Sequence, residues 1–227
     1  MMVSFALDCT NGHLSLAVFS DEKIYGVYKN PNVKNSAEIL SDILSDILTQ
    51  NHLFPCDIKQ IISVAGPGGF SGVRTGTAFI SGMVAVMNTP IKTLSSLESL
   101  SLSIDKPHAD SWIISSLNAR RDAVYISICD ADYNIIIPEQ LCEIADLPVL
   151  LNIVPQNKSY YLTGHGSDFI KSILNADDLI AENDISDAVL FGRNAFKIKT
   201  ERPHLPIYLR SPDAEPAKKR FSLPDDL

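Results

Sequence analysis

The stretch "IISVAGPGGFSGVRTGTAFISGMV", residues 61–84, decides how the first half of the chain folds. Its apolar beginning is typical of a buried strand, and its nearly uncharged end is typical of a buried helix. Glycines and a proline separate the two, at Gly66, Pro67, Gly68, Gly69 and Gly72. The stretch therefore predicts a strand, a tight turn and a helix, and it raises the question whether the turn performs chemistry.

Two nucleotide-binding motifs do not match the turn. A P-loop requires Gly-Lys-Ser/Thr at its end, and no such triplet follows the glycines. The dinucleotide fingerprint begins correctly at Gly66 and Gly68, but Ser71 stands where its third glycine belongs. Neither NAD nor FAD is therefore expected.

The segment Gly69-Phe70-Ser71-Gly72-Val73 resembles the nucleophile elbow of a serine hydrolase. The elbow needs a small residue two positions after the serine, and the β-branched Val73 stands there instead. We therefore expect Ser71 to be the N-cap of the helix. A hydrolase that uses Ser71, with His204 and Asp168 as partners, stays open as an alternative.

A strand–turn–strand pattern occurs in both halves of the chain. "LDCTNGHLSLAVFSD" can be laid over "LNARRDAVYISICDA", which places Asp8 opposite Asn118. This repeat predicts an α/β protein of two lobes built from duplicated mixed-sheet units. We expect an N-terminal lobe at residues 1–104, a C-terminal lobe at 105–210 and a flexible tail at 211–227.

The two helices expected in the first half carry many apolar side chains. In the first, Asn35 and Glu38 have the spacing of a capping box, and Ile and Leu cover about half of the circumference, more than the roughly 100° stripe that one core requires. The second has only a narrow polar strip: Arg74, Thr77, Ser81 and Asn88. Such helices either lie inside a single fold or pack on another subunit, and the pattern alone leaves both open.

Composition limits the classes of partner. A net charge of −8 argues against unaided attraction to nucleic acid or anionic lipid. The sequence shows neither a signal peptide nor a membrane span, so we expect a cytoplasmic protein with buried, reduced cysteines. The histidines are scattered without metal-ligand spacing, so we expect each at the surface or in a loop and predict no metal site.

Four ordered motifs resemble the bacterial TsaB (YeaZ) family: "GPGGFSGVRTG", "SSLESL", "LNARRDAVY" and "LPIYLR". The likeness runs from about Ser4 to Arg210. Within the glycine turn, Gly69, Ser71 and Val73 replace the family's usual serine, threonine and leucine. Asn35 stands where the family often has histidine, which leaves a cap in place but removes any role of the imidazole itself.

The resemblance implies an actin/Hsp70-like, ribonuclease-H-type fold and an accessory subunit without catalytic activity. In the family, the chain binds a metal-holding paralogue, TsaD, and an ATPase, TsaE, joins them. The assembly transfers a threonylcarbamoyl group to the tRNA adenosine next to the anticodon, giving t6A. The resemblance thus implies that ATP and metal reside on the partners, that tRNA is reached through the complex, and that the isolated chain forms a homodimer.

The resemblance also assigns roles to residues. The helix face that meets TsaD, or a second copy, would consist of Leu40, Ile43, Leu44, Ile47, Phe79, Met83 and Val86. The glycine turn would shape a surface and present Arg74, through Gly66, Pro67, Gly68, Phe70, Ser71 and Gly72.

Related enzymes hold Mg-nucleotide with acidic residues from both halves. Here Asp8 has only Asn118 as its counterpart, which weakens the alternative of nucleotide hydrolysis at Asp8. Asp8 itself would then be a turn-forming residue. Arg120 and Arg121 beside Asn118 are possible contacts for a partner or for tRNA phosphate.

Overall fold

The computed structural model describes residues 2–209, except 34, 120–121, 156–157 and 175–177. A first sheet has the strand order β3-β2-β1-β4-β5. Its central strand β1 runs antiparallel to β2 and parallel to β4. The strands are β1 (Val3–Asp8), β2 (Leu14–Phe19), β3 (Ile24–Asn30), β4 (Ile58–Val64) and β5 (Ile91–Leu94).

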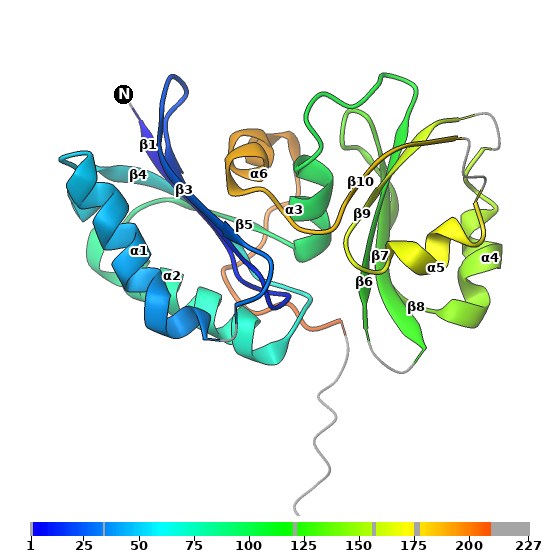
Figure 1. The fold of residues 1–227 in the computed structure, drawn as a ribbon, viewed down its shortest axis with the longest axis horizontal. Coiled ribbons are helices and arrows are strands. Elements are labelled where there is room, and N and C mark those ends of the chain that lie inside the picture. The colour runs from blue at the N-terminus through cyan, green and yellow to red at the C-terminus, as the bar shows by residue number, and fades with distance from the viewer. Residues whose placement is uncertain (1, 34, 120–121, 156–157, 175–177, 210–227) are drawn as a thin grey trace, which may run out of the picture.

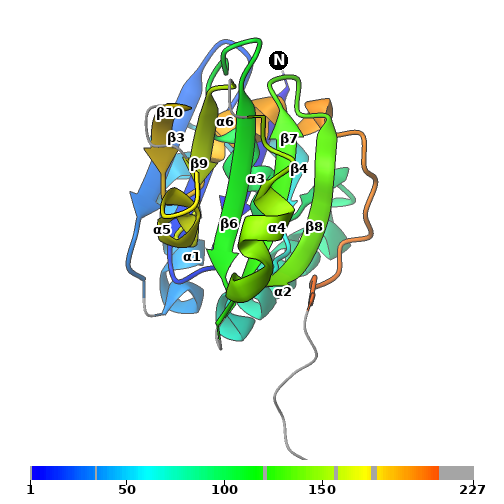
Figure 2. The ribbon, with the colours of Figure 1, turned by 90° about the vertical axis from the view of Figure 1, so that its right-hand side faces the viewer.

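A second sheet repeats this arrangement, with the order β10-β9-β6-β7-β8 (Figure 2). Its central strand β6 is antiparallel to β7 and parallel to β9, as β1 is to β2 and β4 in the first sheet. Asp8 at the end of β1 and Asn118 at the end of β6 therefore occupy equivalent positions. The predicted duplication is therefore confirmed. The strands are β6 (Trp112–Asn118), β7 (Ala123–Asp130), β8 (Ile135–Glu143), β9 (Tyr160–Thr163) and β10 (Leu179–Asn183).

The helices form three layers around the two sheets (Figure 1). Helices α1 (Ser36–Gln50) and α2 (Phe70–Met87) cover the outer face of the first sheet. We call this sheet and these two helices the first lobe. Helices α4 (Leu147–Leu151) and α5 (Ser167–Lys171) cover the outer face of the second sheet, the second lobe. Helices α3 (Ser96–Leu102) and α6 (Ala188–Asn194) lie between the sheets. The fold is the predicted two-lobed α/β architecture.

The central strands are apolar on both sides because each faces two cores. In β1, Phe5 and Leu7 pack with α1 and α2, whereas Ala6 packs toward α6. Strands with both faces covered read as continuous apolar runs instead of alternating ones. The middle core takes buried residues from both sheets and from α6, among them Ala6, Phe19, Ile62, Leu94, Ile113, Cys129, Tyr161 and Phe191.

The chain crosses between the lobes twice, from α3 to β6 and from β10 to α6. After the second crossing it returns to the first sheet, although Arg202 still contacts Glu139 of β8. Helix α6 contacts β1 and β2, the Ile207 N–H donates to the Ala65 carbonyl at 2.7 Å, and Lys92 donates to the Thr200 carbonyl. The end of the range expected for the C-terminal lobe thus packs on the first lobe. The boundary at residue 104 stays a prediction, and residues 211–227 lie outside the described part.

Helix α1 begins where the sequence predicts, but its capping box is absent. Asn35 is the N-cap, and its side-chain amide donates to the carboxylate of Glu38 at 2.9 Å instead of accepting from the backbone. A capping box occurs at α3, between Ser95 and Glu98. Of the helices that the structure describes, none has the length and apolar character needed to cross a membrane.

Candidate functional site

The glycine turn, residues 66–72, packs against the turn that joins β1 to β2. The Gly69 N–H donates to the Thr10 carbonyl at 2.8 Å, and the Cys9 thiol donates to the Gly72 carbonyl at 3.3 Å. A Cβ atom at Gly72 would overlap the Cys9 carbonyl oxygen, and one at Gly68 would lie 2.5 Å from that of Thr10. Glycine is therefore needed here for the close approach of two backbones.

The other side of the glycine turn contacts the C-terminal segment. Gly66 has a φ of +106°, and a Cβ atom there would lie 2.7 Å from the Ile207 carbonyl oxygen. Just beyond, the Arg74 Nε–H donates to the Tyr208 hydroxyl at 3.2 Å, and the rings of Tyr208 and Phe70 lie 5.1 Å apart. The turn is held between two protein segments, and Arg74 and Phe70 are exposed beside it.

Ser71 is not the N-cap of α2, contrary to the prediction. The cap is Gly69, whose carbonyl accepts the first helical bond from the Val73 N–H, so Ser71 already lies in the first turn with an exposed side chain. Among the described residues, no hydrogen bond joins Ser71 to a histidine. The His204 ring bonds the Thr77 carbonyl at 3.1 Å instead. The groups that a hydrolase would need are not assembled at Ser71.

Part of the predicted interface faces inward. Leu40 is fully buried and Leu44 is 6% exposed, because this side of α1 packs on the chain's own sheet. The assignment of Leu40 to a surface is therefore wrong. Thr77 is also buried and donates to the Val73 carbonyl, so it does not belong to an outer polar strip. A helical wheel identifies apolar arcs but does not say which arc the sheet covers.

The rest of the predicted interface is accessible. Val86 is 86% exposed, and the other members are partly buried: Ile43, Ile47, Phe79 and Met83. Between them, the exposed face of α2 consists mainly of short side chains: Ala78, Ser81, Gly82 and Ala85. The outer face is thus smoother and less apolar than the sequence suggests, with Val86 projecting from it.

An apolar groove runs between α1 and α2, which we call the α1–α2 groove. Its volume is about 550 Å³, and Phe54, which is 69% exposed, stands on its edge. A neighbouring hollow at the end of α2 shares Phe54 and Met87 with it. The apolar lining of the groove consists of Leu44, Leu48, Leu53, Phe54, Pro55, Phe79, Met83 and Met87.

Asp8 lies at the centre of a buried polar cluster. Its Oδ1 accepts hydrogen bonds from the Thr10 N–H at 2.9 Å and the Thr10 hydroxyl at 2.8 Å. Its Oδ2 accepts from Ser186 at 2.6 Å and Ser99 at 3.3 Å, with His13 Nε2 at 3.3 Å. Burial raises the pKa of this carboxyl, but the charge of His13 and the hydrogen bonds outweigh burial and bring the pKa to about 2.

The residues between the lobes do not fit a Mg-nucleotide of the kind that related enzymes hold. A carboxylate offers about four lone-pair positions, and the contacts above occupy those of Asp8. The equivalent position in the second lobe is the amide Asn118, not a second carboxylate. Within the described residues, no group of three metal-ligating side chains occurs. Arg120 and Arg121 lie outside the described residues, so their suggested contacts stay a prediction.

His13 lies in the loop between β1 and β2, which agrees with the expectation of a surface or loop position, but it is not at the surface. It is only 4% exposed, because its ring packs against Asp8 and lies 3.1 Å from the Ser186 hydroxyl. No spacing in the sequence could have signalled this contact, since Ser186 is far along the chain. The interaction depends entirely on how the second crossing returns to the first lobe.

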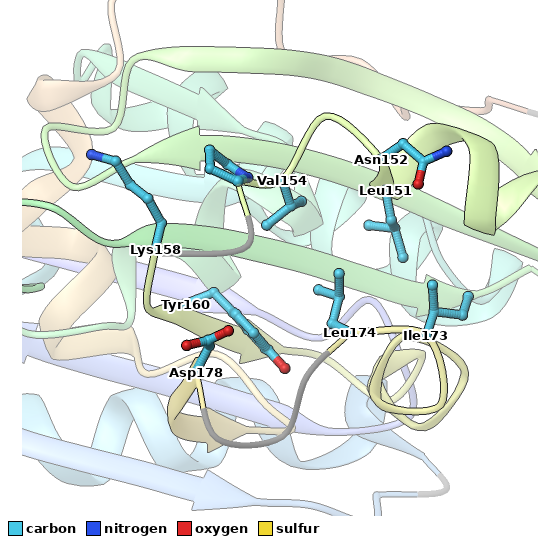
Figure 3. Close-up of a pocket in the computed structure, with 9 residues that line it drawn as sticks. Leu151, Asn152, Val154, Lys158, Tyr160, Ile173, Leu174 and Asp178 are labelled. Carbon is cyan, nitrogen blue, oxygen red and sulfur yellow. The ribbon is translucent and has the colours of Figure 1, made fainter.

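A separate hollow of about 500 Å³ lies at the outer end of the second lobe (Figure 3). Leu151, Ile173 and Leu174 lie on one side of it, and Lys158, Tyr160 and Asp178 lie on the other. Lys158 is paired with Asp110 at 3.4 Å. None of the residues predicted to be functional lines this hollow.

Comparison with known families gives one match over most of the chain. Residues 15–200 match the family described as "TsaD: tRNA N6-adenosine threonylcarbamoyltransferase". Two curated relatives are both called "tRNA threonylcarbamoyladenosine biosynthesis protein TsaB". The relative from Bacillus subtilis is 24% identical over 176 residues, which are 76% of this chain and 75% of its own. The relative from Buchnera aphidicola subsp. Baizongia pistaciae is 26% identical over 213 residues, 90% and 96% of the two chains.

Solved structures agree on the fold. YeaZ from Pseudomonas aeruginosa superposes with a TM-score of 0.75 at 19% identity, covering 92% of this chain and all of that chain. At this identity the likeness concerns the arrangement of strands and helices. It supports the two-lobed fold that the strand orders show directly.

Proposed function

Since the chain belongs to the TsaD-type threonylcarbamoyltransferase family, as one of its TsaB members, we propose that it is an accessory subunit in t6A synthesis. Its curated relatives are named for the biosynthesis of tRNA threonylcarbamoyladenosine. In this proposal the chain performs no chemistry of its own. It binds the metal-holding paralogue TsaD, and the ATPase TsaE joins the pair.

The α1–α2 groove and the exposed face of α2 are the proposed contact surface for TsaD. The groove supplies a depression lined by Leu44, Phe79 and Met83, and Val86 projects beside it. Short side chains along α2 allow a partner helix to approach closely. When TsaD is absent, the same surface would bind a second copy of this chain.

Burial at this surface would contribute appreciably to binding. Covering one large apolar side chain contributes roughly 1.5–3 kcal/mol, and Phe54 and Val86 both have most of their surface available. Single exposed apolar residues are common on protein surfaces and need no partner. Here Phe54 lines the apolar groove and Val86 lines the hollow that adjoins it, and contiguous apolar patches are typical of interaction sites. This contiguity is the observation that carries the proposal.

The absence of catalysis by this chain is also a proposal, and two observations support it. The Asp8 carboxylate is filled by protein donors, and Ser71 has no histidine bonded to it among the described residues. ATP and metal are therefore proposed to reside on the partner subunits. The net charge of −8 supports contact with tRNA through the complex instead of through this chain alone.

Reconstitution tests this function. TsaD, TsaE, tRNA and threonylcarbamoyl-AMP would be mixed with and without the purified chain, and t6A would be measured by mass spectrometry of the digested tRNA. We expect modification only when the chain is present. Equal modification in its absence would contradict the proposal. So would ATP turnover, or labelling of Ser71 by a fluorophosphonate probe, in the chain alone.

A further inference from the structure

One carboxylate contacts both the helix that leads into the first crossing and the loop of the second crossing. Asp8 Oδ1 is bonded within its own turn, to Thr10. Asp8 Oδ2 accepts from Ser99, which lies in α3 just before the first crossing, and from Ser186, which lies in the second crossing between β10 and α6. The two oxygens therefore have different roles: one shapes a turn, and the other joins the crossings.

Further hydrogen bonds hold the second crossing at the same place. The Asp187 N–H donates to the Ser103 hydroxyl at 2.8 Å, and the Ala188 N–H donates to the Ser15 hydroxyl at 3.0 Å. Ser103 caps the end of α3, and Ser15 lies on β2. Ser186, Asp187 and Ala188, at the end of the crossing and the start of α6, are thus bonded to the first sheet and to α3.

We propose that Asp8 is a lock: it fixes α3 and the second crossing at the end of β1, and through these two connections it sets the position of the second lobe. It does so where the residues present do not fit a Mg-nucleotide. All four side chains around its Oδ2 oxygen, including its own, are nearly or wholly buried: Asp8, His13, Ser99 and Ser186. A buried carboxylate that lost these donors would be left desolvated, so separating the crossings from Asp8 is costly. The lobes therefore hold one arrangement.

The same residue types form hydrolytic triads, but the geometry here is different. The Ser186 hydroxyl donates directly to the Asp8 carboxylate, whereas a triad places the imidazole between the two. Ser186 is also fully buried, so no substrate would reach its oxygen. The cluster is therefore assigned to holding the fold and not to catalysis.

The first test removes only the contacts of Oδ2. The double variant Ser99→Ala/Ser186→Ala keeps Asp8 and its turn, and Ser127→Ala is the matched control. Ser127 is also a buried serine, but its bond to the Ile137 carbonyl stays within the second sheet. Hydrogen–deuterium exchange, followed by mass spectrometry, is expected to accelerate about tenfold or more in residues 99–112 and 183–188 of the double variant only. Unchanged exchange at both crossings would overturn the proposal.

The second test measures the distance between the lobes. Cys56 is exposed in the first lobe, the other cysteines are buried, and Val149 is 75% exposed in the second lobe, so a Val149→Cys variant can be spin-labelled at two sites. Double electron–electron resonance should give one narrow distribution of the distance between the two labels, and Mg-ATP should not change it. The distribution should broaden when Ser99→Ala/Ser186→Ala is added. A shift with Mg-ATP, or an unchanged width in the double variant, would contradict a lock.

Discussion

Cys9 and Gly72 meet where the end of β1 touches the start of α2. The Cys9 thiol donates to the Gly72 carbonyl at 3.3 Å, and the Gly72 Cα faces the Cys9 carbonyl oxygen with no room for a side chain. The glycine turn is therefore a packed junction between two backbones. Its position determines the position of α2, and hence of the surface proposed to bind TsaD.

Replacing Gly72 by alanine should destabilise the fold. The new Cβ would overlap a backbone oxygen, which cannot rotate away, so a loss of about 1–3 kcal/mol in the free energy of unfolding is expected. Gly82→Ala is the matched control in the same helix. A Cβ there meets nothing within 4 Å, and this variant should gain about 0.5–1 kcal/mol. Urea denaturation measures both, and equal stability of the two variants would contradict the packed turn.

Leu40 should contribute to the stability of the fold, although the sequence analysis predicted it at an interface. It is fully buried against the first sheet, so Leu40→Ala should lower the free energy of unfolding by about 2–5 kcal/mol. Val86→Ala, at an 86% exposed position, should change it by less than about 0.5 kcal/mol. Thermal or chemical denaturation of the isolated chain distinguishes them. A stability loss at residue 86 as large as that at residue 40 would be inconsistent with this orientation of the helices.

Because of Asp8, the free energy of unfolding should depend on pH in the acidic range. Its pKa is lowered from 3.8 to about 2 in the folded chain, so the folded state binds the proton less readily than the unfolded state. The stabilisation is complete above about pH 4 and is lost as the pH falls towards 2, and its size is about 2 kcal/mol. The difference in urea midpoint between the wild type and Asp8→Asn should shrink over this range. A difference that stays constant from pH 5 to 2 would refute the assigned pKa.

Arg202 should contribute to the stability of the fold because it pairs with two carboxylates. Its guanidinium donates to Glu98 of α3 and to Glu139 of β8, both largely buried. Arg202→Met leaves these carboxylates unpaired, and a loss of about 3–5 kcal/mol in the free energy of unfolding is expected. Lys158→Met removes an exposed pair with Asp110 and should cost less than about 1 kcal/mol. Similar losses in the two variants would show that the two ion pairs of Arg202 do not stabilise the fold as expected.

Local patterns predicted the elements and the repeat. The apolar run at residues 61–64, the glycines after it and the helix that follows were all identified, because strand and helix periodicity is written in neighbouring residues. The equivalence of Asp8 and Asn118 was also identified, since both end the central strand of a sheet.

Contacts between distant segments could not be predicted. Ser186 reaches Asp8, and Ile207 reaches the glycine turn, only after the chain has crossed back to the first lobe. The burial of Leu40 depends on which side of α1 meets the sheet, and an apolar arc on both sides leaves that undecided. Ser71 has the residue type of a cap, but the helical bonding begins at the Gly69 carbonyl. In each case the deciding partner lies outside the local sequence.

The most direct measurement is the affinity of the purified chain for TsaD, by isothermal titration calorimetry. Two single variants are compared, and each places one negative charge on a different lobe. Val86→Asp puts a carboxylate in the hollow that adjoins the α1–α2 groove, and Val149→Asp puts one on another exposed valine, in α4. We predict that the first variant remains folded and loses at least about a hundredfold in affinity, whereas the second binds like the wild type. Wild-type affinity in Val86→Asp, or an equal loss in both variants, would contradict this prediction.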